Sequence, residues 1–189
     1  MKLPTDLAVD AASDPIRFIK SHTALHEPPL VPELKLHLAT EGDALWEMGE
    51  AELDATGLPA TFWAFAWAGG QALSRYILDN PSIVSGKHVL DFGSGSGLVG
   101  LAAMQAGATS ALSADIDRFA CIAASLNAAA NSLTLSTTDQ DLVGEDGSWD
   151  VILVGDMCYE QPLAGEVEAW LRDQSSKGVT VLIGDPGRT

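Results

Sequence analysis

A glycine-rich turn between an apolar strand and a small-residue helix is the clearest chemical feature of this sequence. The stretch DFGSGSG begins with the acid Asp91 and carries Gly93, Ser94, Gly95 and Gly97. Glycines let the backbone approach a ligand where any Cβ would collide, and the helix N-terminus behind them offers N–H groups. The turn therefore predicts a site for a nucleotide-type cofactor, with these four residues among its contacts.

Two cofactor classes fit the turn. The stretch 95–100 matches G-x-G-x-x-G, which is the dinucleotide fingerprint and is weak evidence alone. Asp91 argues against a dinucleotide, because a carboxylate so close to the first glycine would repel a pyrophosphate. The same carboxylate suits the amino group and sulfonium of S-adenosylmethionine, so we expect Asp91 near the amino-acid end of that cofactor. A turn without a ligand is the structural alternative.

Further acids follow the next strands. Asp115, with Ile116 beside it, ends the second strand of the pattern, where an acid reaches ribose hydroxyls in nucleotide-binding folds. Asp117 is better placed as the N-cap of the following helix. Asp141 comes after the third strand and could accept from the adenine amino group, although a surface-loop acid is the alternative.

The stretch GDMCYEQP, residues 155–162, is the second informative segment. It directly follows the fourth strand and brings Asp156, Tyr159 and Glu160 to positions three and four apart. Carboxylate and phenol oxygens can accept the N–H bonds of an amine and aim its lone pair, and such orientation can supply much of a rate. The structural alternative is that Glu160 favours a helix N-terminus and that Tyr159 packs. We interpret these three residues as catalytic.

Strand and helix patterns alternate through the larger part of the chain. We expect helices at 98–106, 118–131 and 162–173, and strands at 87–92, 110–114, 133–137, 149–154 and 179–183. Such alternation predicts an α/β fold with a doubly wound, Rossmann-like parallel sheet and a ligand at the carboxyl ends of the strands. Residues 61–189 would form this core.

Residues 1–60 do not fit a nucleotide-fold sheet. A helix starting at Pro15, a short strand at 34–38 and a helix at 43–56 are expected there. We predict that they form a helical and extended cap over the carboxyl edge of the sheet.

Composition restricts the partners. Acidic residues outnumber basic ones 26 to 10, giving a formal charge of −16, so nucleic acid is disfavoured and a basic protein surface is compatible. No apolar run reaches the length of a membrane span, and no apolar leader follows Lys2, so a cytoplasmic location is expected. Cys121 and Cys158 lack zinc spacing, and Pro28 soon follows the His22/His26 pair, so no metal is expected.

The motifs together resemble a known family. The glycine loop is that of class I S-adenosylmethionine methyltransferases, and D-M-C-Y-E resembles the D-x-x-Y-[DE] signature of the family 16 lysine methyltransferases. Within that group, FWAFAWAGGQALSRYIL, SADIDRFA and VLIGDPGR resemble enzymes that methylate the electron transfer flavoprotein β subunit. The resemblance implies lysine placement by Asp156, Tyr159 and Glu160, and cofactor contacts at Trp67, Asp91, Gly93, Gly95 and Asp115. Trp63 is interpreted as a core aromatic.

The resemblance also implies a substrate and a fuller fold. The expected acceptor is a lysine of the flavoprotein β subunit; the alternatives are a ribosomal protein of the L11 or L7/L12 type, a small-molecule amine, or a silent cofactor-binding module. Class I methyltransferases have seven strands, and five account for this sequence, which ends at Thr189. We therefore expect the C-terminal strand pair to be absent and the fifth strand to form an exposed edge.

Overall fold

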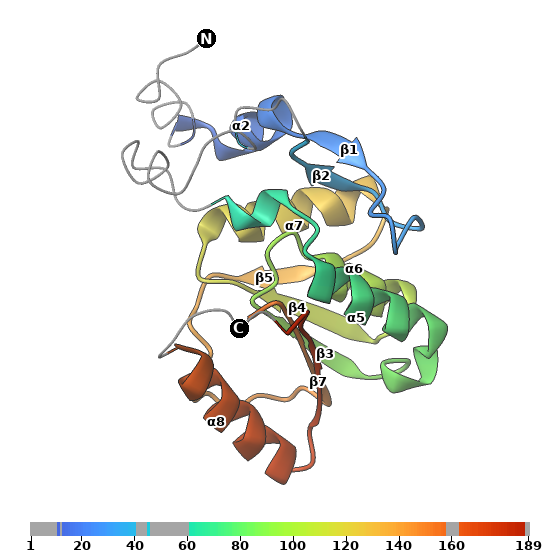
Figure 1. Cartoon of the computed structure of the whole chain (residues 1–189), viewed down its shortest axis with the longest axis vertical. Coiled ribbons are helices and arrows are strands. Elements are labelled where there is room, and N and C mark those ends of the chain that lie inside the picture. The colour runs from blue at the N-terminus through green and yellow to red at the C-terminus, as the bar shows by residue number, and fades with distance from the viewer. Residues whose placement is uncertain (1–10, 12, 41–44, 46–60, 158–162, 188–189) are drawn as a thin grey trace.

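The centre of the molecule is a five-stranded parallel sheet. The computed structural model describes residues 11, 13–40, 45, 61–157 and 163–187. The strands lie in the order β5-β4-β3-β6-β7 (Figure 1), and they are β3 (His88–Phe92), β4 (Ser110–Ala114), β5 (Ser136–Thr138), β6 (Val151–Gly155) and β7 (Thr180–Gly184). The chain starts at β3, builds outward to β5 and then returns to β6. Ligands of doubly wound sheets bind at this reversal, outside the carboxyl ends of the strands.

Four of the five predicted strands are confirmed to within two residues. The exception is β5, which was expected at 133–137 and begins only at Ser136. Leu133 and Leu135 come before it and pack with the helices that cover the sheet. Pairing with β4 starts afterwards, where Ser136 lies opposite Leu112. The apolar character of Leu133 and Leu135 therefore reflects contact with the helices and not strand pairing.

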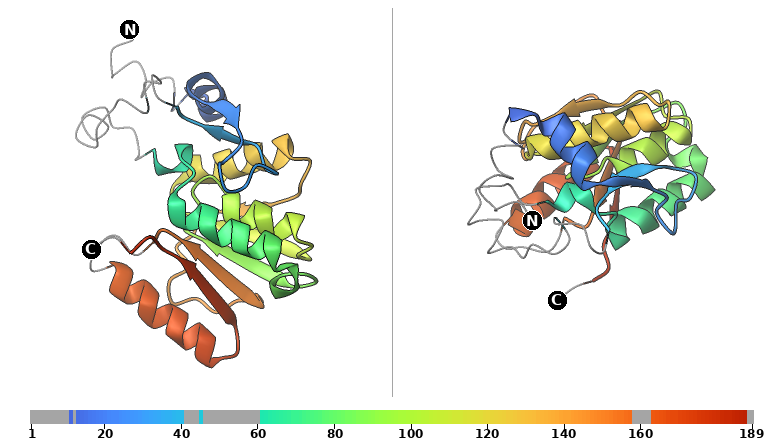
Figure 2. Two further views of the ribbon diagram at one scale, coloured as in Figure 1. Left: turned by 45° about the vertical axis from the view of Figure 1, so that its right-hand side comes forward. Right: turned by 90° about the horizontal axis from the view of Figure 1, so that it is seen from above.

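Helices cover both faces of the sheet (Figure 2). Helices α5 (Ala68–Asp79), α6 (Leu98–Gln105) and α7 (Arg118–Ala130) lie on one face, and α8 (Leu163–Ser176) lies on the other. Side chains of β3 alternate between them: Val89 packs with α5 and α6, whereas Leu90 and Phe92 pack with α8. Every residue of β3 after His88 is buried, as expected for a parallel strand covered on both sides.

The N-terminal segments form a third layer. Helix α2 (Pro15–His22) begins as predicted, with Asp14 accepting from the N–H of Arg17 at 3.0 Å. Strands β1 (Ala24–His26) and β2 (Leu36–Leu38) pair antiparallel. The N–H of His37 donates to Asn127 Oδ1 of α7 at 2.7 Å.

The hairpin of this layer lies elsewhere than the cap expected for residues 1–60, which otherwise stays a prediction. The leucines of β2 pack on α6 and α7, so the hairpin covers helices and not the carboxyl edge of the sheet. The predicted helix at 43–56 lies outside the described residues except for Leu45, and the boundary between 60 and 61 stays a prediction. Among the helices that the structure describes, none is long and apolar enough to cross a membrane.

Candidate functional site

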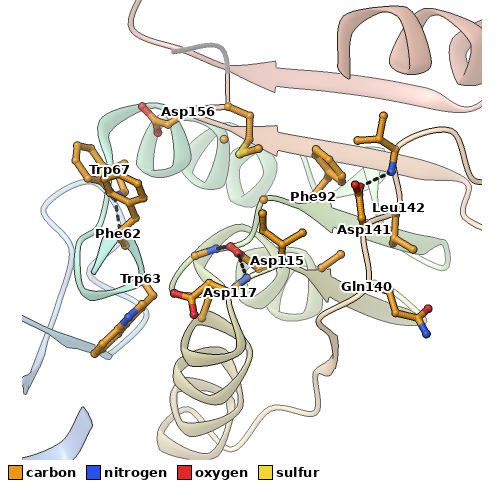
Figure 3. Close-up of a pocket in the computed structure, with 18 of the residues that line it drawn as sticks. Phe62, Trp63, Trp67, Phe92, Asp115, Asp117, Gln140, Asp141, Leu142 and Asp156 are labelled. Carbon is orange, nitrogen blue, oxygen red and sulfur yellow. Dashed lines mark hydrogen bonds between the residues drawn. The ribbon is translucent and has the colours of Figure 1, made fainter. Parts of the chain in front are cut away.

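A cavity of about 430 Å³ lies at the carboxyl ends of the strands (Figure 3). It collects side chains from the ends of β3, β4, β6 and β7, from the start of α7, and from the loops before α5 and after β5. Its polar or charged lining residues are Asp115, Asp117, Gln140, Asp141, Asp156 and Asp185. The fold therefore brings most of the sequence-predicted site residues to one place. Gln140 and Asp185 were not predicted.

Asp115 is held at the cavity wall by two backbone donors (Figure 3). Its Oδ2 accepts from the N–H of Gly95 at 2.8 Å, and its Oδ1 accepts from the N–H of Asp117 at 3.0 Å. Burial raises the pKa of the Asp115 carboxyl. Each carboxylate oxygen has a second lone pair, so the fixed side chain can also accept from a ligand hydroxyl.

The residues after Asp115 divide into an apolar contact and a helix cap. Ile116 is 75% exposed and lines the cavity, which is unusual for a large apolar side chain. Asp117 is the N-cap of α7, and its Oδ1 accepts from the N–H of Phe119 at 2.8 Å. The cap interpretation is confirmed, and burial, with Asp115 nearby, raises the pKa of Asp117 to about 6.

Asp141 lines the cavity beyond β5, together with Leu142 and Val143. Its Oδ1 accepts from the N–H of Val143 at 3.0 Å, which fixes the loop on itself (Figure 3). The Asp141 carboxylate can accept from the polar edge of an aromatic base, and the apolar side chains next to it can pack on the face of that base. Gln140 adds an amide beside it and gave no signal in the sequence.

The glycine turn is arranged differently from the expectation. The N–H groups of Gly93 and Ser94 both donate to the carbonyl of Ala114, at 2.9 and 3.1 Å, and Gly95 donates to Asp115. These amides therefore bind β4 and its end, and the turn contributes shape more than donors. Gly93 and Gly95 line the cavity with φ of +66° and +49°, a region that favours glycine.

Two predicted cofactor contacts in the turn do not line the cavity. Ser94 is 8% exposed. Gly97 begins α6 with φ of +77°, and a Cβ there would lie 2.7 Å from the Cβ of Ala124. Gly97 is therefore needed for the close approach of α6 and α7. The cofactor contacts expected at Ser94 and Gly97 stay predictions.

Asp91 lies behind the cavity wall, and its expected contact with the cofactor stays a prediction. It is 1% exposed and does not line the cavity. Its Oδ2 accepts from the N–H of Gly100 at 2.9 Å and from Ser113 Oγ at 3.0 Å, so it joins β3 to α6 and β4. Side chains alternate along a strand, and Asp91 falls on the helix-covered face. Burial raises its pKa to about 7, since the groups around it only partly offset the lost hydration.

Asp156 leaves β6 in a strained conformation. Its φ is +56°, which is uncommon for a residue with a Cβ, and its N–H donates to the carbonyl of Gly184 at 2.8 Å. Its Oδ2 accepts from the N–H of Gly70 at 2.7 Å, at the N-terminus of α5. A Cβ at Gly69 would lie 2.2 Å from the Gly184 carbonyl oxygen and 2.7 Å from that carboxylate. Strain of this kind gathers at functional sites.

Aromatic side chains form the wall beside Asp156 (Figure 3). Trp67 lines the cavity, and its Nε1 donates to the carbonyl of Phe62 at 2.9 Å. Trp63 touches the cavity but is 1% exposed and belongs to a core cluster, as its core interpretation requires. Tyr159 and Glu160 lie outside the described residues.

The lining chemistry fits S-adenosylmethionine. Five carboxylates line the cavity, and no Lys, Arg or His of the described residues does. Such a wall repels the pyrophosphate of a dinucleotide and attracts a ligand that carries an ammonium and a sulfonium. The left-handed glycines leave room where a Cβ would intrude, since a Cβ at Gly93 would lie 2.2 Å from the sulfur of Met157. In the described part of the chain, no group of three metal-ligating side chains is present.

Comparison with known proteins points to protein methylation. The family described as "Ribosomal protein L11 methyltransferase (PrmA)" matches residues 71–155. Proteins named electron transfer flavoprotein beta subunit lysine methyltransferase align over most of the chain. That of Xenopus laevis is 44% identical over 181 residues, covering 94% of this chain and 72% of its own. That of Homo sapiens is 43% identical over 162 residues, covering 84% and 61%.

A more distant relative extends the same match. The homologue from Caenorhabditis elegans is 36% identical over 184 residues, covering 88% of this chain and 74% of its own. The chain thus spans 61 to 74% of the length of these three relatives.

Proposed function

This chain belongs to the electron transfer flavoprotein beta subunit lysine methyltransferase family, and on that premise we propose that it transfers a methyl group from S-adenosylmethionine to a lysine of that flavoprotein subunit. The observation that carries the proposal is the cavity at the sheet reversal, which is lined by carboxylates and by no described cation. The names of the relatives support the choice of acceptor.

The end of the cavity near β4 would hold the nucleoside. Asp115 would accept from the ribose hydroxyls, because backbone donors already fix its two oxygens in place. Ile116 would pack on the adenine, and Asp141 would accept from its amino group. Gly93 and Gly95 would let the amino-acid end pass close to the turn, and Trp67 would border it.

The end near β6 would hold the acceptor. Bound in the cavity, S-adenosylmethionine would supply an electrophilic methyl group to a neutral amine, with S-adenosylhomocysteine as the leaving group. Asp156 would accept an N–H of that amine and aim its lone pair, and Tyr159 and Glu160 would share this task. The bond from Gly70 restricts the Asp156 carboxylate, and a restricted acceptor is what orientation requires. The proton released from nitrogen passes to solvent.

A methyl-transfer assay with purified flavoprotein tests the proposal. The chain is incubated with radiolabelled cofactor and electron transfer flavoprotein, the subunits are separated, and labelled peptides are identified by mass spectrometry. Label on a lysine of the β subunit is expected. Calorimetry should show that S-adenosylhomocysteine binds and NAD does not. Binding of NAD alone would overturn the cofactor assignment.

A ribosomal protein is the second candidate acceptor. The match of residues 71–155 to the ribosomal protein L11 methyltransferase family favours it. Labelling total lysate proteins separates the two, because label confined to a ribosomal protein would replace the flavoprotein as acceptor. No label on any protein, despite cofactor binding, would indicate a silent binding module or a small-molecule acceptor.

A further inference from the structure

A second carboxylate, from the strand next to β6, lines the same cavity as Asp156. Strands β6 and β7 are parallel neighbours, and Gly155 lies opposite Gly184 in their register. The next residues along the two strands are Asp156 and Asp185, and both line the cavity. The N–H of Gly187 donates to Asp185 Oδ1 at 2.7 Å, which restrains that carboxylate over the end of β7. Two acids from neighbouring strands therefore flank the same end of the cavity.

An aromatic pair forms the adjoining wall. Phe62 is 44% exposed and Trp67 is 36% exposed, although both are large apolar side chains. Their ring centroids are 5.9 Å apart at an interplanar angle of 70°, and both line the cavity. Figure 3 shows the two rings together on the side of Asp156, across the cavity from Asp141 and Gln140. Both rings therefore contribute exposed apolar surface to the cavity wall.

This combination suits a lysine side chain. Carboxylates accept the N–H bonds of an amine or ammonium, and aromatic rings attract a cationic group and pack on methylene stems. The opposite end, with Asp115, Ile116 and Asp141, already has the groups that a nucleoside needs. The end of the cavity beside β6 and β7 therefore remains for the acceptor.

Resting on the function proposed above, we propose that Phe62 and Asp185 complete the acceptor subsite. The lysine enters beside the Phe62–Trp67 pair, with its methylenes against Phe62. Its amine reaches Asp156 and Asp185, which accept N–H bonds from two sides and set the direction of the lone pair. Asp185 and Phe62 contact the acceptor and not the nucleoside, so their substitution leaves cofactor affinity unchanged. The sequence motifs did not identify Phe62 or Asp185 as site residues.

Steady-state kinetics of the full chain with electron transfer flavoprotein test the subsite. We expect Asp185→Asn and Phe62→Leu each to raise the KM for the flavoprotein about tenfold, the size expected for loss of one charge-assisted or ring contact. The affinity for S-adenosylhomocysteine, measured by calorimetry, should stay within about twofold of wild type. Asp185→Glu should raise the KM for the flavoprotein less than Asp185→Asn does, because glutamate keeps a carboxylate.

Two control variants match these changes outside the cavity. Asp139→Asn removes an exposed acid after the opposite edge strand β5, and Tyr76→Leu removes an exposed ring of α5. Both should keep the wild-type KM. If Asp185→Asn and Phe62→Leu behave like these controls, or weaken S-adenosylhomocysteine to the same degree as the acceptor, the subsite is wrong while the function stands. If the wild-type chain does not label the flavoprotein, both proposals are overturned.

Discussion

The two ends of the cavity are built in different ways. At the β4 end, the carboxylate of Asp115 is held by Gly95 and Asp117, all within the single strand-helix-strand unit of β3, α6 and β4. At the β6 end, Asp156 is held by Gly70, which is 86 residues away in the sequence, and by the backbone of Gly184. The first end is a local structure, whereas the second needs α5, β6 and β7 to be assembled. The β4 end therefore suits binding of the cofactor, and the strained β6 end suits orientation of the acceptor amine.

Loss of Asp156 should produce the largest effect. Asp156→Asn keeps an oxygen that can accept from Gly70, so the strand end should keep its structure. We expect turnover to fall by at least about a hundredfold, because an amide cannot orient the amine as a carboxylate does. Affinity for S-adenosylhomocysteine should stay nearly unchanged. Turnover close to wild type would mean that the acid only caps α5.

Asp115→Ala should lower cofactor affinity, whereas Asp156→Asn should lower turnover. It removes the proposed ribose acceptor and leaves the N–H groups of Gly95 and Asp117 without a partner. We expect calorimetry to give a loss of about 1–3 kcal/mol in S-adenosylhomocysteine binding. Retention of wild-type affinity would remove Asp115 from the cofactor site.

Asp91 should affect stability and its pH dependence. Its pKa is raised by burial to about 7 in the folded chain and lies near 3.9 in the unfolded chain. The folded state therefore holds the proton more tightly, so the stability contributed by this group is fully present below about pH 4 and is lost as pH rises toward 7.

Asp91→Asn removes this titration. Between about pH 4 and 7, wild type should lose stability relative to the variant by up to about 1.4 kcal/mol per pH unit. Urea unfolding at several pH values measures the difference. Parallel pH profiles for the two chains would show that the carboxyl does not titrate in this range.

Asp117→Ala should have the smallest effect. Loss of an N-cap costs about 1 kcal/mol of stability, which urea unfolding detects. S-adenosylhomocysteine affinity should fall less than in Asp115→Ala, because Asp117 is bonded to the N–H of Phe119. An equal loss of affinity would place Asp117 in the ribose site as well.

The sequence by itself determined the features that depend on neighbouring residues. Apolar runs and turns located β3, β4, β6 and β7, and the spacing after β4 separated Asp115 from the cap Asp117. The glycine turn was recognisable because only glycine adopts its left-handed conformations easily. An apolar run can indicate either a strand or a helix contact, and the prediction of a strand at Leu133 and Leu135 is wrong because both pack with helices.

Only the tertiary structure decided which way side chains face and what lies beside them. The place of Asp91 before the turn favours a cofactor contact in the sequence, whereas strand alternation directs its side chain to Gly100 and Ser113. Asp156 and Asp185 line one cavity because β6 and β7, which α8 separates in the chain, are paired with Gly155 opposite Gly184. A sequence pattern specifies the order of residues along each strand, whereas the contacts between strands arise from packing across the whole sheet.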